Sequence, residues 1–277
     1  MSHLISVEEA ILRFREGQTV FLDVRFTFGE PTAGQEAYQR NHIPGAIHFD
    51  LNEDLSGPIM AHGGRHPLPD PDLFARKLGA AGIGPSTPVI VYDDQKGAVA
   101  ARLWWMLRYY GHDDVRMLDT GFTQWCIAGG AVTAAPAAPN SNVFTPHICK
   151  EMTIDASEIS RRLSDPGLLL IDSRVHGSYT AEQPTKYPVN GHIPGALNRY
   201  WEDGLSGEGV FLHSVEQKKR FADLPPHAEY AVYCNAGVTA CPNVLALTEA
   251  GYKNVRLYVG SWGDWISYPA NPIATGE

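Results

Sequence analysis

The chain has 277 residues, 44% of them apolar and 19% charged, which is the composition of a globular protein and excludes a disordered one. Its 31 acidic and 22 basic residues give a net charge of −9. That charge argues against binding to nucleic acid or to an anionic membrane, because both need a basic surface. An anionic substrate would need a locally basic pocket. At about 150 residues per domain, the length predicts two domains.

The N-terminus lacks a basic stretch followed by an apolar run, and no segment approaches the roughly 20 apolar residues that span a bilayer. The cysteines are too few and too scattered for a disulfide scaffold or for a zinc site with paired Cys-x-x-Cys motifs. We therefore expect a reduced, soluble, cytoplasmic protein without a metal, in which any functional cysteine is catalytic. The four cysteines are Cys126, Cys149, Cys234 and Cys241.

The first half of the chain alternates between strand and helix patterns. Ser6 and Glu9 form a capping box, which predicts the start of an amphipathic helix. Residues 88–92 are apolar almost throughout, which is typical of a strand buried on both faces of a parallel sheet. The other predicted strands span 20–23 and 115–118, and further helices are predicted over 72–78 and 100–110.

The segment 134–147 separates two such series of elements. It is rich in Ala and Pro at its start, which predicts a semi-extended linker between domains over residues 1–133 and 148–277. Strands that alternate with helices predict an α/β fold, with a parallel sheet flanked by helices in each domain. In the second series we predict a capping box at 155–158, strands over 168–172, 230–233 and 255–258, and a helix over 240–250.

The two halves also share sequence. Residues 42–57 read HIPGAIHFDLNEDLSG and residues 192–207 read HIPGALNRYWEDGLSG, so eight of 16 positions match at an offset of 150. Other segments match at offsets of 149, 141 and 140, a drift that insertions and deletions in loops produce. The chain is therefore predicted to contain two tandem copies of one domain.

Cys234 stands where a strand of the second copy ends and the loop to a helix begins. Ligands of open parallel sheets bind outside the carboxyl ends of the strands. The N–H groups of this loop can point inward as an anion-binding nest, with a helix N-terminus behind them. Such a setting stabilises the anionic form of a thiol and of any sulfur attached to it, so Cys234 is the candidate nucleophile. The alternative, a small buried apolar residue, is the interpretation that we favour for Cys241.

The first copy carries Asp93 at the position of Cys234, in a loop with one additional residue. A carboxylate cannot act as a sulfur nucleophile, and we expect an anion-binding nest to repel it. The first copy is therefore predicted to be inactive, and to pack against the second copy and close one wall of a cleft.

Together these features resemble the two-domain rhodanese family of sulfurtransferases. The resemblance covers nearly the whole chain, and each motif is only moderately specific, whereas their doubled order is highly specific. The motifs are DVR (23–25), DSR (172–174), two HIPGA turns, HPLP (66–69), AARLWWMLRYYG (100–111), CNAGVTAC (234–241) and GSWGDW (260–265).

The resemblance implies an inactive first rhodanese domain, a catalytic second one and no metal or organic cofactor. Cys234 would take a sulfane sulfur from an anionic donor, thiosulfate or 3-mercaptopyruvate, and form a persulfide. It would then pass the sulfur to cyanide, a thiol or a protein acceptor. The loop N–H groups would hold the terminal sulfur as an oxyanion hole holds charge. The persulfide-stabilising loop would consist of Asn235, Ala236, Gly237, Val238, Thr239 and Ala240.

Three positions depart from the family pattern. Asn235 stands where Arg or Gly is common. The second residue after the cysteine is usually Lys in thiosulfate-preferring members and Ser in mercaptopyruvate-preferring members, and here it is Ala236. The family also places an Arg just before the aromatic residue that follows the DSR motif, and here that position is Ser178. Two cations expected for a doubly charged thiosulfate are therefore missing.

Other basic side chains are candidates to supply the missing charge. Arg174 is the nearest by the family pattern, and its alternative role is an ion pair with Asp172 or Asp23. Lys186 lies in the long loop before the second HIPGA turn, where a lysine is usually just solvated. The remaining substrate-binding candidates are Ser178, Arg102 and His66, the last of which belongs to the HPLP motif.

Two other functions remain open at this point. A phosphatase or arsenate reductase of the same fold needs a Cys-x5-Arg loop whose Arg clamps the oxyanion, and here the corresponding position is Ala240. A persulfide carrier or partner-binding module, with little turnover on small donors, would agree with the missing cations. Steady-state assays with both donors distinguish a carrier from a catalyst.

Overall fold

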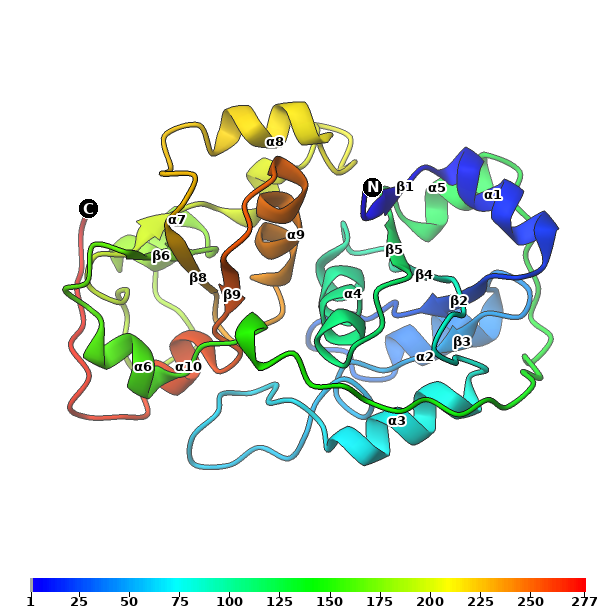
Figure 1. Cartoon of the computed structure of the whole chain (residues 1–277), viewed down its shortest axis with the longest axis horizontal. Coiled ribbons are helices and arrows are strands. Elements are labelled where there is room, and N and C mark those ends of the chain that lie inside the picture. Colours follow the sequence, from blue (N-terminus) through cyan, green and yellow to red (C-terminus); the bar gives the residue numbers. More distant parts are fainter. Residues whose placement is uncertain (1) are drawn as a thin grey trace. The chain divides into compact units, whose positions relative to one another are not determined.

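The computed structural model describes residues 2–277, which divide into two compact units. Unit 1 comprises the residues up to Gly57, Leu68–Cys149 and Gly209–Phe211, and unit 2 comprises Pro58–Pro67, Lys150–Glu208 and Leu212–Glu277. Each unit contains one parallel sheet with helices packed on it, as predicted (Figure 1).

The sheet of unit 1 has five strands in the order β1-β5-β4-β2-β3, with every neighbouring pair parallel. β4 lies near its centre, where Val91 pairs with Leu22 of β2 and with Met117 of β5. The strands are β1 (Leu4–Ile5), β2 (Val20–Asp23), β3 (Ile47–His48), β4 (Val89–Tyr92) and β5 (Val115–Leu118), and the helices are α1 (Val7–Glu16), α2 (Ala33–Arg40), α3 (Pro71–Ala80), α4 (Ala98–Tyr109) and α5 (Phe122–Ile127).

The sheet of unit 2 has four parallel strands in the order β7-β6-β8-β9, so β8 has a neighbour on each side. The strands are β6 (Leu168–Asp172), β7 (Leu197–Asn198), β8 (Glu229–Tyr233) and β9 (Val255–Leu257). The α-helices are α6 (Ala156–Arg161), α7 (His176–Thr180), α8 (Ser214–Arg220), α9 (Cys241–Ala250) and α10 (Ser261–Trp265), and two 3-10 turns span Lys150–Met152 and Trp201–Gly204.

Local sequence signals set the starts of equivalent helices in the two units. The Ser6 hydroxyl accepts a hydrogen bond from the Glu9 N–H at 3.3 Å, and the Asp155 carboxylate accepts one from the Glu158 N–H at 2.7 Å. Both predicted helix starts and their N-caps are therefore confirmed, and the carboxylates of Glu9 and Glu158 pair with Arg116 and Arg256. α4 is buried on almost all sides, and α9 likewise, because each carries a nearly continuous apolar sequence against its sheet.

Two segments have structures that their composition did not predict. The backbone of the segment 134–147 is tied to unit 1, since the Asn142 N–H donates to the Gly79 carbonyl and the His147 N–H donates to the Tyr110 carbonyl. Residues 58–67, which come from the first half of the chain, belong to unit 2. We call residues 58–67 the strap loop.

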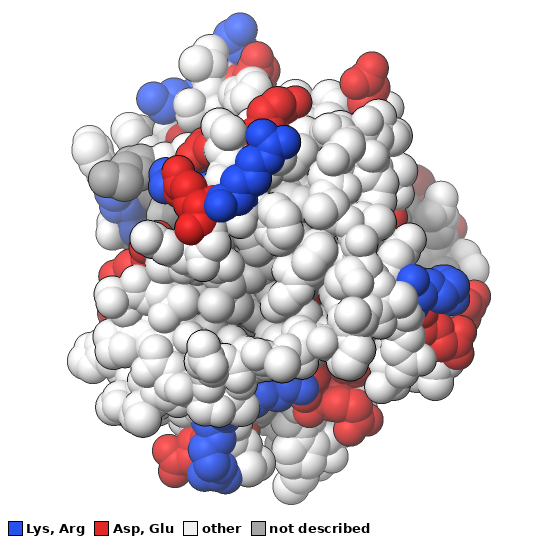
Figure 2. Space-filling view, turned by 90° about the vertical axis from the view of Figure 1, so that its right-hand side faces the viewer, with Lys and Arg blue, Asp and Glu red and all other residues white. Residues whose placement is uncertain are grey.

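The surface carries scattered charge. Figure 2, which views the molecule from the right-hand side of Figure 1, shows Lys, Arg, Asp and Glu around the edge of a largely uncharged face. On this face no broad basic patch of the described residues is visible. None of the helices in the described part of the chain has the length and apolar character needed to cross a membrane.

Candidate active site

Cys234 follows β8 directly, at the carboxyl end of a strand with neighbours on both sides. Its side chain is only 1% exposed. Its immediate surroundings are nevertheless polar: the Gly237 N–H donates to Cys234 Sγ at 3.2 Å, and Ser261 Oγ lies 4.0 Å from the sulfur. The thiol is therefore covered, but it is not enclosed by apolar side chains alone.

The loop after Cys234 is shaped by Gly237, whose φ is +74°. A Cβ at this position would lie 2.2 Å from the Val259 carbonyl oxygen, so only glycine fits. Among the described residues, the N–H groups of Val238, Thr239 and Ala240 have no recorded acceptor. The loop after Cys234 therefore contains N–H groups that have no acceptor within the described part of the chain.

α10 holds the backbone of Cys234 in place. The Cys234 N–H donates to Ser261 Oγ at 3.1 Å, and its carbonyl accepts from the Trp262 N–H at 3.0 Å. Ser261 adopts a φ of +56°, an unfavourable conformation for a residue with a side chain. Its hydroxyl also donates to the Tyr258 carbonyl at 2.8 Å, so the hydrogen bonds of one side chain hold this turn together.

Arg174 forms the ion pair with Asp172 that the sequence offered as its alternative role, with an Nη2–Oδ2 distance of 2.5 Å. It also donates to the Gly191 carbonyl at 2.7 Å, and its guanidinium lies 4.8 Å from the Trp262 ring centre. Burial opposes the charge of Arg174, but Asp172 outweighs this, with a smaller contribution from Cys234, and raises the pKa of Arg174. Its Nη1 is buried and has no partner among the described residues.

The strap loop is anchored to α10 and the residues after it. The Gly63 N–H donates to Asp264 Oδ1 at 2.7 Å. His62 Nδ1 lies 2.7 Å from Ser267 Oγ, and its ring stacks on Tyr268 at 4.1 Å. These contacts fix a segment from the first half of the chain within unit 2.

The strap loop brings Arg65 close to Tyr187, with the guanidinium carbon 5.7 Å from the ring centre. The Tyr187 hydroxyl donates to the Asn235 carbonyl at 3.0 Å, which places the ring over the loop. Burial raises the pKa of Tyr187, and the charge of Cys234 adds to this. Burial lowers the pKa of Lys186, and the charge of Arg65 lowers it further. Arg65 therefore lies near both Lys186 and Tyr187, and Tyr187 contacts the loop after Cys234.

The other residues that the sequence singled out lie in four different elements of the structure. Ser178 lies on α7 and is half-buried, and His66 follows Arg65 in the strap loop. Arg102 is fully buried in α4 of unit 1, where it donates to the Leu55 carbonyl at 3.5 Å. Its surroundings are thus the core of unit 1. Cys241 is fully buried at the start of α9, and its thiol donates to the Gly237 carbonyl at 3.3 Å.

Arg65, Tyr187 and Asp264 are the site residues that the sequence analysis missed. Arg65 directly precedes the HPLP motif and Tyr187 directly follows Lys186, so both lie beside residues that were singled out. What no local pattern shows is that the strap loop packs with unit 2. Within residues 2–277 there is no group of three or more His, Cys, Asp or Glu side chains that could hold a metal ion.

The equivalent loop of unit 1 corrects one expectation. The Asp93 carboxylate is not repelled by a nest of N–H groups but occupies one, because these dipoles attract an anion. Burial raises the pKa of Asp93, although each of the hydrogen bonds from the loop lowers it. All four contacts are 2.9 Å long: Oδ1 accepts from the N–H groups of Gln95 and Gly97, and Oδ2 accepts from those of Val99 and Ala100.

Comparison with known proteins identifies the family. The model of the rhodanese-like domain matches the chain twice, over residues 6–128 and 155–268. The chain belongs to the rhodanese family. It is 41% identical, over 100% of its length and 99% of the relative's, to the "Probable 3-mercaptopyruvate sulfurtransferase" of Pseudomonas aeruginosa. It is also 33% identical to the thiosulfate sulfurtransferase of Cricetulus griseus, over 88% of this chain and 84% of that one.

A solved structure agrees with this assignment. The crystal structure of SseA from Escherichia coli, described as a 3-mercaptopyruvate sulfotransferase, superposes with a TM-score of 0.83 at 27% identity, covering 95% of this chain and 99% of that one. The predicted tandem rhodanese fold is confirmed. This rhodanese is a sulfurtransferase enzyme, which acts on a sulfur donor and a sulfur acceptor.

Proposed function

We propose that Cys234 is the nucleophile that carries the sulfur, through a persulfide, from a small anionic donor to a thiophilic acceptor. The observation that supports this most strongly is the loop that follows β8. It combines a thiol at the end of a central strand, one N–H group on its sulfur, and neighbouring N–H groups without acceptors. No other cysteine of unit 2 among the described residues has this setting, since Cys241 lies within α9.

The first half-reaction forms the persulfide. The Cys234 thiolate attacks the sulfane sulfur, so that a bond from Sγ to this sulfur forms and the bond between this sulfur and the donor breaks. The electron pair of the broken bond leaves with the donor, as sulfite from thiosulfate or as the enolate of pyruvate from 3-mercaptopyruvate, which then takes a proton. A covalent intermediate splits one difficult transfer into two easier steps.

The second half-reaction regenerates the thiolate. A nucleophilic acceptor, which we propose to be a thiol or a protein sulfur acceptor in the cell and cyanide in the assay, attacks the outer sulfur. The bond between the two sulfurs breaks, and its electron pair returns to Sγ. Because the loop N–H groups stabilise negative charge on the outer sulfur before the attack and on Sγ after it, they serve both steps.

Unit 1 supports this role of the loop. In unit 1 the N–H groups of Val99 and Ala100 bind a carboxylate oxygen at 2.9 Å. The residues at the same positions in unit 2, at an offset of 140, are Thr239 and Ala240. We infer that these two N–H groups bind the outer sulfur of the persulfide where their counterparts bind Asp93.

The charges near Cys234 favour 3-mercaptopyruvate over thiosulfate as the donor. Thiosulfate carries its sulfonate directly beside the transferred sulfur, and Ala236 provides no cation there. The carboxylate of 3-mercaptopyruvate is separated from its sulfur by two carbon atoms. Arg65 lies beside the Tyr187 ring and near enough to Lys186 to lower the pKa of that lysine. We infer that these two cations bind such a carboxylate.

Donor access requires a movement in unit 2, because Cys234 is only 1% exposed. The hydrogen bond from the Tyr187 hydroxyl to the Asn235 carbonyl holds the Tyr187 side chain over the loop after Cys234. We propose that the donor displaces Tyr187 while its carboxylate pairs with Arg65 and Lys186. We further propose a reducing, cytoplasmic location, in which the cysteines form no disulfide.

Mass spectrometry of the intact protein and of its peptides tests the proposal. After incubation with 3-mercaptopyruvate and no acceptor, the Cys234 peptide should carry one added sulfur, and cyanide should then remove it with formation of thiocyanate. Repeated turnover at a rate limited by the donor would exclude a mere carrier. The proposal is wrong if the sulfur appears on another cysteine while the Cys234 peptide stays unmodified.

A further inference from the structure

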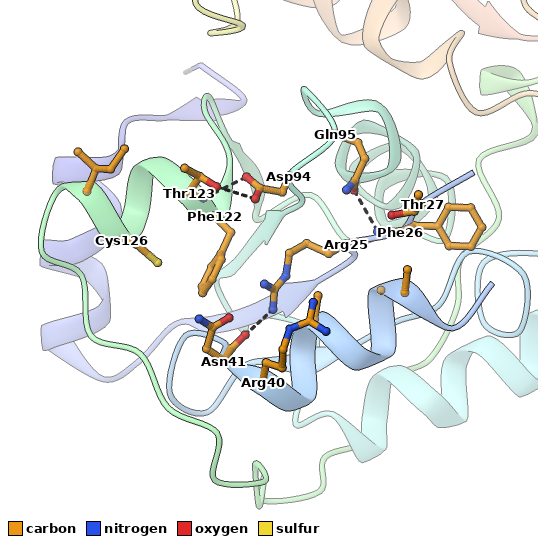
Figure 3. Close-up of a pocket in the computed structure, with 14 residues that line it drawn as sticks. Arg25, Phe26, Thr27, Arg40, Asn41, Asp94, Gln95, Phe122, Thr123 and Cys126 are labelled. Carbon is orange, nitrogen blue, oxygen red and sulfur yellow. Dashed lines mark hydrogen bonds between the residues drawn. The ribbon is translucent and has the colours of Figure 1, made fainter. Parts of the chain in front are cut away.

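Unit 1 has an open pocket of about 400 Å³ at the carboxyl ends of β2, β4 and β5. This is the edge of a parallel sheet where ligands bind, and the volume is within the range of small-molecule sites. The residues that follow these strands line it, together with α2 and α5 (Figure 3). The nest of the same loop is already filled by Asp93, so no sulfur chemistry is expected here.

Arg25 provides a fixed guanidinium in this pocket. It is buried, pairs with Asp23 at 2.7 Å and donates to the Asn41 carbonyl at 2.6 Å. The Phe122 ring lies 4.1 Å from its guanidinium carbon. Arg25 corresponds to Arg174 of unit 2, whose Nη1 is buried without a partner.

The Nη1 of Arg25 differs from that of Arg174. Within residues 2–277 it has no hydrogen-bond partner, and it is not fully buried as the Nη1 of Arg174 is. This nitrogen therefore keeps some exposure to solvent, although the side chain as a whole is buried. Figure 3 shows the guanidinium of Arg25 between Phe122 and Asn41, inside the pocket.

The pocket contains two guanidinium groups, those of Arg25 and Arg40, and one carboxylate, that of Asp94. Arg40, in the last turn of α2, lines the pocket and has no ion-pair partner among the described residues. The Gln95 Oε1 already accepts from the Phe26 N–H at 3.0 Å. The Asp94 carboxylate already accepts from the N–H of Thr123 at 3.0 Å and from its hydroxyl at 2.7 Å.

We propose that this pocket binds a small organic carboxylate, with its charged group on Arg25 and Arg40 and its apolar body against Phe122. Guanidinium groups match the two oxygens of a carboxylate, and a partly buried setting strengthens the pairing. The apolar part of the wall consists of Ala33, Ala37, Phe122 and Ile127. This site is separate from the one that contains Cys234, and it does not depend on the mechanism proposed above.

Cys126 provides a local reporter, because its exposed thiol lines the same pocket (Figure 3). We would follow the alkylation of the Cys126 peptide by iodoacetamide with mass spectrometry, with benzoate or its uncharged analogue benzamide present. Benzoate should slow alkylation at least about threefold, with half-protection at millimolar concentration, as ligand efficiency predicts for so small a molecule. Benzamide should give no protection.

Variants locate the effect. Arg40→Ala should abolish protection by benzoate, and Arg40→Lys should retain part of it. Arg15→Ala, which removes an exposed arginine on α1, should leave protection unchanged. Because Arg40 is exposed, its replacement should leave the fold intact. The proposal is overturned if benzoate gives no protection, if benzamide protects equally, or if Arg40→Ala is protected as well as the wild type.

Discussion

The loops that follow β4 and β8 hold the same position in two copies of one domain, yet their N–H groups differ in what they bind. In unit 1 the Asp93 carboxylate accepts hydrogen bonds from four N–H groups of its own loop, so the anion is a permanent part of the loop. In unit 2 the Gly237 N–H donates to Cys234 Sγ, and the N–H groups of Val238, Thr239 and Ala240 have no acceptor among residues 2–277.

This difference shows how one backbone motif can be structural in one copy and chemical in the other. A carboxylate carries its oxygens far enough from the chain to fill the nest, whereas a thiol stops short of it. The room that the shorter side chain leaves is what a second sulfur needs. Unit 1 also has one additional residue in its loop, and Lys96, just before the glycine that both loops share, adopts a φ of +59°.

The largest expected effect is the loss of the nucleophile. Cys234→Ser should reduce thiocyanate formation from 3-mercaptopyruvate and cyanide at least about 1,000-fold, because a hydroxyl cannot form a persulfide. Cys241→Ser is the matched control, and it should keep activity within about threefold, since a serine hydroxyl can also donate to the Gly237 carbonyl that the thiol contacts. Substantial sulfur transfer by the Cys234→Ser variant would show that Cys234 is not the nucleophile.

The filled nest of unit 1 is tested through stability. Asp93→Ala leaves four N–H groups without an acceptor, and at about 1–3 kcal/mol for each unsatisfied buried group we expect the free energy of unfolding to fall by about 3 kcal/mol or more. Urea denaturation measures this change. Asp94→Ala, at the exposed neighbouring position, should cost less than about 1 kcal/mol. Equal losses for the two variants would show that the nest contributes nothing.

The strap loop supplies Arg65, whereas the loop after Cys234 contains no basic residue. Arg65→Ala should raise the KM for 3-mercaptopyruvate about tenfold and leave kcat within about threefold, as expected for lost ground-state binding. Asp264→Asn, which weakens the anchor of Gly63, should shift KM in the same direction but less. Arg76→Ala, an exposed arginine on α3, is the control. A change in kcat alone would contradict this role of Arg65.

A cation placed next to the sulfur should change donor preference. Ala236→Lys should raise kcat/KM for thiosulfate about fivefold through an added charge pair, without a similar gain for 3-mercaptopyruvate. Ala236→Gln has a side chain of comparable length without the charge, and it separates charge from bulk. No gain for the lysine variant, or an equal gain for the glutamine variant, would refute the explanation from missing charge.

The smallest effect concerns pH. Because burial and Arg65 lower the pKa of Lys186, this lysine loses its charge at a lower pH than a free lysine does. The kcat/KM for an anionic donor should therefore fall a few-fold as the pH rises through this lowered pKa. Lys186→Arg stays charged and should remove the fall. An unchanged profile in the arginine variant would assign the titration to another group.

Much of the scaffold was predictable because local signals agree with the fold. β2, β5 and β6 have the predicted bounds, since each is a short, largely apolar run with a neighbouring strand on both sides. α2 and α8 were missed, because both are short and rich in polar residues.

The site was predictable only where its residues are neighbours in sequence. Cys234 and its loop follow from one strand, one glycine and one helix. The position of Arg65 depends on contacts of the strap loop with residues about 200 positions later, such as Gly63 with Asp264. The occupation of the nest by Asp93 depends on a hydrogen-bond geometry that composition does not reveal.

The most direct test of the comparison is a crystal structure of the protein after reaction with 3-mercaptopyruvate in the absence of an acceptor. We expect the outer sulfur of the Cys234 persulfide to lie within hydrogen-bond distance of the N–H groups of Thr239 and Ala240, where Asp93 Oδ2 lies in the other copy. An outer sulfur that points away from these groups, or a second sulfur bound elsewhere, would contradict the account.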